Sequence, residues 1–244
     1  MRCFRVGIEY DGTEFAGFQF QPGLRTVQQQ IEDAVARLTG ARVRVDAAGR
    51  TDAGVHALGQ VVSLRVDTRI PTERLSAALN SALPRDVRAV GAVEADERFH
   101  ARFSARSRAY VYVLLQREHP SALFGRYAWH VPGPLDIAAM RSAARSLPGT
   151  RDFAAWANGV VEARTTVREV TLCRVRRAGR LVLVRIEANA FLRGMVRNVV
   201  GTLVQVGLGR RPPEDVEAIT LSRQRSEAGP TAPPQGLCLV RVRY

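Results

Sequence analysis

The sequence predicts a mixed α+β fold built from two halves. In both halves, segments in which apolar and polar residues alternate, as in strands, are interspersed with amphipathic segments typical of helices. A polar, arginine-rich stretch over residues 95–107 separates the halves. With 244 residues, 46% of them hydrophobic, the chain can bury a core in each of two small domains. We therefore expect an N-terminal domain over residues 1–104 and a C-terminal domain over residues 105–244.

The first half predicts the order strand, helix, strand, strand, helix, strand. Apolar and polar residues alternate over 4–10, as expected for the first strand. Thr26 then begins a helix, with Gln29 placed as in a capping box, and Gly40 ends it. The other expected elements are strands at 43–48 and 60–66, a helix at 72–83 and a strand at 87–93. This order is the ferredoxin-like β-α-β-β-α-β pattern.

The second half repeats this rhythm, although its sequence shows no useful identity to the first. Its expected elements are strands at 110–115, 167–176, 181–188 and 237–242, and helices at 135–147, 191–206 and 213–221. Two ferredoxin-like halves with largely antiparallel sheets, joined side by side, would leave a basic cleft between them. Antiparallel sheets can leave one face open, and an open, basic face suits RNA.

The charge of the chain points to a polyanionic partner. The formal net charge is +13 and the sequence pI is about 11.1, which favours nucleic acid. An anionic membrane surface, or arginine enrichment without function, would also explain it. All 36 basic side chains are arginine, which excludes a Schiff-base lysine and a P-loop lysine.

The cysteines, the histidines and the hydropathy of the sequence indicate its cellular compartment and argue against a metal site and a membrane span. The three cysteines are far apart without a C-x-x-C pair, as in proteins of a reducing compartment. The four histidines lack metal-ligand spacing, so we expect no metal. No signal-type run begins the sequence, and no apolar stretch reaches the ~20 residues that span a bilayer. We expect a soluble, cytoplasmic protein.

The loop GRTDAGVHA at residues 49–57 is the most informative segment for function. Gly49 and Gly54 permit turns around a carboxylate, Asp52, that lies near the guanidinium of Arg50. Such a carboxylate can be aimed at a ligand. The structural alternative is an Asx-type turn, in which Asp52 bonds only its own backbone.

Five segments together resemble the tRNA pseudouridine synthase A family. They occur in family order and span nearly the whole chain: YDGTEFAGFQ at 10–19, GRTDAGVHA at 49–57, FHARFSA at 99–105 with YVY at 110–112, NAFLRGMVRN at 189–198, and GPTAP at 229–233 with GL at 236–237.

The resemblance implies an isomerase that converts uridine to pseudouridine at nucleotides 38, 39 and 40 of the tRNA anticodon stem-loop. It implies that Asp52 is the catalytic nucleophile, that Tyr110 contacts the target base, that Arg197 pairs with Asp52 and that Arg50 places the flipped nucleotide. It further implies a homodimer without cofactor or metal.

The residues fit this chemistry. An ionised carboxylate can attack a sugar or base carbon or stabilise positive charge at C1′, and the sequence leaves attack at C6, attack at C1′ and elimination open. The detached uracil needs a partly apolar pocket, for which Phe191, Leu192 and Val196 are candidate walls.

Two other classes of protein stay open on the residues alone. A non-catalytic RNA-binding module would also have a basic sheet. This sequence, however, lacks the aromatic run typical of such modules, and a binding module would have no use for Asp52. A glycosidase needs two carboxylates, and only Asp46 on the preceding strand could join Asp52.

Overall fold

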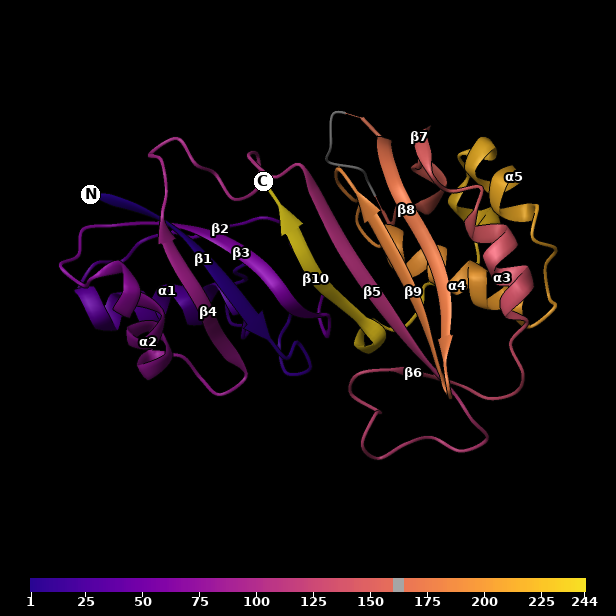
Figure 1. Ribbon diagram of the computed structural model, residues 1–244, viewed down its shortest axis with the longest axis horizontal. Helices are drawn as coiled ribbons and strands as arrows, with labels where there is room; N and C mark the ends of the chain where they lie inside the picture. Colours follow the sequence, from indigo (N-terminus) through magenta and orange to yellow (C-terminus); the bar gives the residue numbers. More distant parts are fainter. Residues whose placement is uncertain (160–164) are drawn as a thin grey trace. The chain divides into compact units, whose positions relative to one another are not determined.

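The computed structural model describes residues 1–159 and 165–244 and divides the chain into two compact units (Figure 1). Unit 1 comprises Met1–Arg106 with Cys238–Tyr244, and unit 2 comprises Ser107–Leu237. Helices and mostly antiparallel strands make up both units, which confirms the predicted α+β class. The last strand therefore groups with the start of the chain.

The first six elements of unit 1 follow the order predicted for the first half, and the last strand of the chain, which was expected in the second half, joins them. These are β1 (Arg2–Tyr10), α1 (Val27–Thr39), β2 (Asp46–Ala47), β3 (His56–Val66), α2 (Thr72–Ala82), β4 (Val87–Glu94) and, from the end of the chain, β10 (Leu237–Arg243). The strand order is β4-β1-β3-β10, and β2 also pairs with β3. β1 is antiparallel to β3 and to β4, whereas β10 is parallel to β3.

Helix α1 forms where the capping residues predict it. The side chain of Thr26 accepts a hydrogen bond from the Gln29 backbone N–H at 3.4 Å, and Gly40 ends the helix at φ 73°. Ile31 and Val35 are buried on its inner face, and each such side chain contributes roughly 1.5–3 kcal/mol by burial. The helix is thus fixed by its caps and one apolar face.

The strand predicted at 43–48 is wrong in length: the strand is Asp46–Ala47, and Ala48 N–H adds one hydrogen bond of 2.8 Å to the Val61 carbonyl of β3. The Val45 backbone N–H donates instead to Glu32 Oε1 of α1 at 3.0 Å. The Val45 N–H is thus bonded to a helix side chain instead of to the backbone carbonyl of a neighbouring strand. β3 is longer than predicted and begins at His56, so the last residues of the 49–57 loop belong to the sheet.

Unit 2 contains the other elements predicted for the second half, but the strand predicted there at 237–242 lies in unit 1. It also contains two short strands that the sequence pattern missed. The elements of unit 2 are β5 (Ser107–Gln116), β6 (Trp129–Val131), α3 (Ile137–Ala144), β7 (Gly149–Asp152), η1 (Ala154–Trp156), β8 (Val167–Ala178), β9 (Leu181–Ala188), α4 (Met195–Gly207), α5 (Asp215–Ser222), η2 (Arg225–Glu227) and η3 (Pro234–Gly236). The antiparallel order is β5-β9-β8-β7, and β6 runs parallel to β5. Figure 1 shows α3, α4 and α5 grouped beside β8.

Helix α4 begins later than the predicted 191–206, at Met195, because Gly194 turns the chain at φ 73°. Inside the helix, a Cβ on Gly201 would lie 1.8 Å from the carbonyl oxygen of Pro230. Only glycine fits this approach, so the segment over 228–233 packs directly on the helix backbone.

Candidate active site

The Asp52 loop is shaped by glycines at close backbone approaches. Gly54 has φ 75°, and Gly17 has φ 111° with its Cβ position 3.0 Å from the Thr51 carbonyl oxygen. Across this contact, Phe18 N–H donates to the Thr51 carbonyl at 3.0 Å. The YDGTEFAGFQ segment therefore lies directly against the GRTDAGVHA loop.

Buried hydrogen bonds fix the chain just before Asp52. The Tyr10 hydroxyl lies 2.7 Å from Thr51 Oγ1, and Gln60 Nε2 donates to the Gly49 carbonyl at 2.7 Å and to the Tyr10 hydroxyl at 3.3 Å. Tyr10 is 3% exposed and Gln60 is fully buried. Burial raises the pKa of Tyr10 well above its usual range, so the phenol stays neutral and serves as a hydrogen-bonding group for Thr51 and Gln60.

Sequence reasoning assigned no role to Tyr10 or Gln60. The signal available for Gln60 was an uncharged polar residue among the apolar positions of a strand, since a buried amide must find partners. The signal for Tyr10 was its place as the last residue of β1, directly before the turn-forming Asp11-Gly12 pair.

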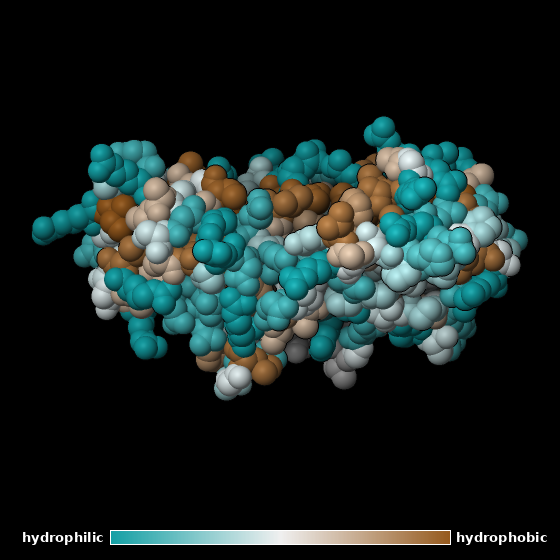
Figure 2. Space-filling model, turned by 90° about the horizontal axis from the view of Figure 1, so that it is seen from below, coloured by the Kyte–Doolittle hydropathy of each residue, from teal (hydrophilic) through white to brown (hydrophobic). Residues whose placement is uncertain are grey.

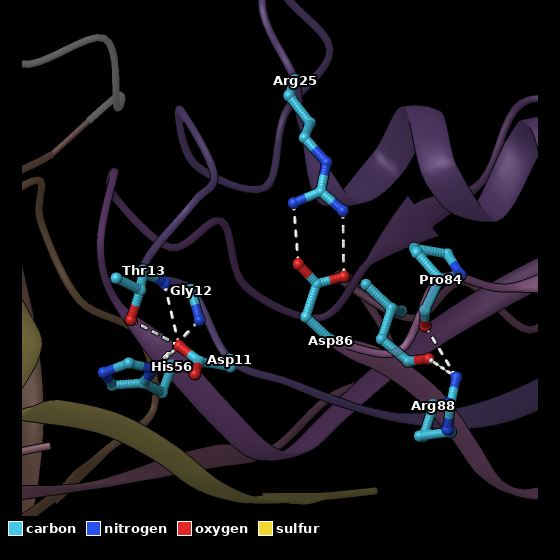
Figure 3. A network of polar contacts seen from close by, with 9 residues as sticks. Asp11, Gly12, Thr13, Arg25, His56, Pro84, Asp86 and Arg88 are labelled. Carbon is cyan, nitrogen blue, oxygen red and sulfur yellow. Dashed lines mark hydrogen bonds and ion pairs between the residues drawn. The ribbon is translucent and has the colours of Figure 1, made fainter. Parts of the chain in front are cut away.

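His56 locks the first motif to the end of the loop (Figure 3). Its Nδ1 accepts a hydrogen bond from Gly12 N–H at 3.0 Å and lies 3.2 Å from Asp11 Oδ1. Both the Gly12 N–H and the Asp11 carboxylate thus face the same ring nitrogen. A Cβ on Gly12 would lie 2.0 Å from the Val55 carbonyl oxygen, so no other residue fits. His56 is structural, as its buried position indicates.

The carboxylate of Asp11 forms the turn that its Asp-Gly sequence predicts. Asp11 Oδ1 accepts from Thr13 N–H at 3.0 Å and from Thr13 Oγ1 at 2.6 Å. In the same unit, the Arg25 guanidinium donates two hydrogen bonds, of 2.7 and 3.0 Å, to the Asp86 carboxylate (Figure 3). These polar contacts brace the segment on which the loop rests.

Within this frame, Asp52 is half-buried and Arg50 is exposed. The turn at Asp52 closes through its backbone, whose carbonyl accepts from Val55 N–H at 3.2 Å. The structure therefore places a carboxylate and a guanidinium two residues apart on one rigid loop. This arrangement suits a carboxylate that must meet a substrate without rearranging.

The other two predicted site residues lie in unit 2. Tyr110 of β5 is 7% exposed, and its ring meets that of Phe191 edge-on at 5.1 Å and 88°. Arg197 of α4 donates from Nε to the Ala232 carbonyl at 2.7 Å, and Ala232 N–H donates to the Arg197 carbonyl at 3.1 Å. Of the predicted walls, Leu192 and Val196 are buried and Phe191 is half-buried. The pairing of Arg197 with Asp52 stays a prediction.

A second network, which sequence reasoning missed, holds the segment that contacts Arg197. Asn198 is fully buried, and its Oδ1 accepts from Arg225 Nη2 at 3.0 Å and from Thr231 Oγ1 at 2.6 Å. Arg225 also donates to Asn158 Oδ1 at 3.1 Å and to the Gly229 carbonyl at 3.1 Å. The second tyrosine of YVY, at position 112, adds a bond of 2.7 Å to the Pro233 carbonyl. The GPTAP segment is thus tied to β5 and α4.

The surface is mostly hydrophilic on the face seen in Figure 2, with apolar side chains in scattered patches. Many of the arginines that give the chain its net charge of +13 are exposed. Among the described residues, no group of three or more His, Cys, Asp or Glu side chains could hold a metal ion. In the same part of the chain, every helix is too short or too polar to cross a membrane.

A family model described as tRNA pseudouridine synthase matches residues 7–104 and 143–244. "tRNA pseudouridine synthase A" of Geobacter sulfurreducens is 45% identical over 244 residues, and that of Moorella thermoacetica is 44% identical over 246 residues, each alignment covering both chains completely. "tRNA pseudouridine synthase A 2" of Clostridium perfringens is 38% identical, again over both full chains. Among solved structures, a far more distant match is the archaeal box H/ACA sRNP Nop10-Cbf5 complex, at 13% identity and a TM-score of 0.38, covering 82% of this chain and 44% of that chain.

Proposed function

The chain belongs to the tRNA pseudouridine synthase family, and from that premise we propose that it converts uridine to pseudouridine in tRNA. The observation that carries the proposal is the Asp52 loop, which lies in the matched region and is held rigid by buried hydrogen bonds. Free uracil as the product would instead indicate a hydrolase, and RNA binding without reaction would indicate a binding module.

The reaction is an isomerisation that the protein's own residues can support. The N1–C1′ bond breaks, the uracil turns, and a C5–C1′ bond forms while C5 loses a proton and N1 gains one. Asp52 supplies the carboxylate as nucleophile. The balance of atoms requires no oxidant, reductant or cofactor.

Three further residues take supporting roles in this proposal. Arg50 places the flipped nucleotide, because it is exposed beside Asp52 on the same loop. Tyr110 contacts the target base, supported by its place next to the Phe191 ring. Arg197 acts with Asp52 as its ionic partner, supported by its position in the matched NAFLRGMVRN segment. Extruding a base costs a few kcal/mol, which contacts of this kind offset.

We further propose that the substrate region is the anticodon stem-loop at nucleotides 38, 39 and 40, that the protein acts as a homodimer and that it works in the cytoplasm. The arginine-rich composition supports a tRNA partner, because each guanidinium can pair with phosphate. Pseudouridine mapping by sequence, together with light scattering for the oligomeric state, tests these finer points.

The test of the reaction uses transcribed tRNA labelled with tritium at uracil C5. Release of tritium accompanies pseudouridine formation, because C5 loses its hydrogen, and nucleoside analysis identifies the product. Asp52→Asn should release none above background. Asp33→Asn, at a half-buried carboxylate on α1 outside the loop, is the matched control and should keep full activity. Tritium release at a tenth or more of the wild-type rate in Asp52→Asn would contradict the proposal.

A further inference from the structure

Unit 1 carries a hollow of about 150 Å³ beside the Asp52 loop. Its lining comes from three places: the end of the YDGTEFAGFQ segment together with Gln28 of α1, the 44–50 segment and the 100–103 segment. Arg50, two residues before Asp52, is one of the lining residues, so the hollow adjoins the proposed catalytic carboxylate. We call it the Phe103 pocket.

The charge of the Phe103 pocket suits an anion. Arg44, Arg50 and Arg102 line it, against a single carboxylate, Asp46. Asp46 Oδ2 lies 3.6 Å from His100 Nε2, so this carboxylate already faces a neighbouring ring nitrogen. Guanidinium groups gathered in this way bind phosphate oxygens through paired hydrogen bonds.

The rim of the pocket is an exposed aromatic ring on a fixed turn. Phe103 is 75% exposed, its ring centroid is 4.4 Å from that of His100, and the Arg102 guanidinium carbon is 5.6 Å from the Phe103 centroid. The turn is closed by Ser104, whose N–H donates to the His100 carbonyl at 2.9 Å and whose Oγ accepts from His100 N–H at 3.1 Å. The free face of such a ring, next to the Arg102 guanidinium, is a surface on which a nucleic-acid base stacks.

The volume of the Phe103 pocket limits the size of the group that it can hold. Pockets that enclose a drug-sized ligand have volumes of about 300–1,000 Å³, so a hollow of about 150 Å³ holds a smaller group. A phosphate fits the arginine-lined hollow, while the base of the same nucleotide lies outside it against Phe103.

We propose that the Phe103 pocket binds a nucleotide next to the isomerised uridine, its phosphate among Arg44, Arg50 and Arg102 and its base stacked on Phe103. The inference rests on the proposed function, because it takes the RNA to be positioned by Asp52. It adds a second anchoring point, which would keep the RNA in place while the target base is turned.

The test is a double-mutant cycle between Phe103→Ala and tRNA transcripts that lack one base at a time near the target uridine. Removing the base that stacks on Phe103 should weaken wild-type binding by about 5- to 150-fold, the range for aromatic–base stacking. Phe103→Ala should weaken binding of intact tRNA by a similar factor, and the two changes together should cost no more than either alone. Phe124→Ala, at an exposed ring of unit 2 that is 45% exposed, is the matched control without such coupling.

Losses that multiply at every abasic position would overturn the proposal, because they would mean that no base rests on Phe103. If circular dichroism shows that Phe103→Ala is unfolded, Phe103→Leu replaces it, since leucine keeps apolar volume and removes the ring. Binding is measured by filter retention and wild-type pseudouridine formation by tritium release. Absence of pseudouridine would therefore refute the proposed function alone, and absence of coupling would refute the pocket alone.

A second arm tests the phosphate. Arg44→Gln and Arg102→Gln should each make the slope of log affinity against log salt shallower by about 0.7–0.9, the value for one phosphate contact. Arg74→Gln removes an exposed arginine of α2 that does not line the pocket and should leave the slope unchanged. Slopes for both pocket variants that equal the slope of Arg74→Gln would overturn the phosphate assignment.

Discussion

Replacing Tyr10 with phenylalanine tests whether buried hydrogen bonds hold the Asp52 loop in place. The Tyr10 hydroxyl bonds Thr51 Oγ1 at 2.7 Å and accepts from Gln60 Nε2 at 3.3 Å, in surroundings where Tyr10 is 3% exposed. At about 0.5–1.5 kcal/mol for each hydrogen bond, their loss should lower the free energy of unfolding by about 1–3 kcal/mol. Urea unfolding measures this as a lower midpoint at an unchanged slope.

The same variant should lose activity through position rather than through affinity. Thr51 precedes Asp52, so its release lets the carboxylate shift, and a 1 Å misplacement can cost about 10²-fold in rate. We expect kcat to fall by about tenfold or more while the Kd for tRNA stays nearly unchanged. Because burial raises the pKa of Tyr10, its phenol is neutral throughout pH 7–9, and the ratio of wild-type to variant kcat should be constant over that range.

Tyr127→Phe is the matched control, because this tyrosine is 48% exposed. Its change in stability should stay within about 0.5 kcal/mol, as for most surface substitutions. A Tyr10→Phe protein with an unchanged urea midpoint and unchanged kcat would refute the argument that this hydroxyl positions the loop. A kcat ratio that varies with pH would show instead that Tyr10 takes part in proton transfer.

Four further predictions follow from the same structure. Asp52→Asn should lose more than 90% of turnover, a barrier increase above ~1.4 kcal/mol, and keep its affinity for tRNA, because many arginines share the binding. Arg197→Met should lose most of its activity and a little stability, since it removes the 2.7 Å bond to the Ala232 carbonyl as well as the charge; nucleoside analysis and thermal unfolding measure the two effects. The logarithm of the affinity for tRNA should fall linearly with the logarithm of the salt concentration, with a slope of about −0.7 to −0.9 for each phosphate contact. Burial raises the pKa of Cys173 to about 12 and that of Cys238 to about 11; because a raised pKa leaves little thiolate at pH 8, Ellman's reagent should react slowly with the native protein and rapidly in urea.

Each of these predictions has a contrary result. Turnover of a tenth or more in Asp52→Asn would exclude it as the catalytic group. Full activity in Arg197→Met would exclude this arginine from the reaction, and a flat salt dependence would exclude phosphate contacts as the source of affinity. Equal thiol reactivity in native and unfolded protein would show that Cys173 and Cys238 are accessible.

The parts of the fold that follow local rules could be predicted from the sequence. Thr26 and Gly40 mark α1 because a cap and a left-handed turn are set by the residue itself. The order of the first six elements in unit 1 followed from periodicity in the same way. The strand at 43–48 was wrong because Glu32, remote in the sequence, takes the Val45 N–H.

Other features depend on tertiary structure and left little local trace. β6 and β7 are each four residues or fewer, too short for an alternating pattern to stand out. Nothing local about Asn198 shows that Arg225 and Thr231 meet its Oδ1. The motifs predicted Asp52 as the candidate nucleophile, but the groups that hold its loop, Tyr10 and Gln60, became visible only in the folded sheet.

The parallel pairing of β10 with β3 has a consequence for how the chain folds during synthesis. Cys238 and Leu239 lie opposite His56 and Ala57, and a Cβ on Gly59 would lie 2.4 Å from the Val240 carbonyl oxygen. β3 pairs with β1 and β2, but its first residues therefore lack the β10 neighbour until residues after 237 emerge from the ribosome. At about 5–20 residues per second, the intervening unit 2 delays that event by on the order of 10 s. Throughout this interval the start of β3 stays open to pairing with other chains, so the segment after the Asp52 loop completes its sheet only when the end of the chain has been made.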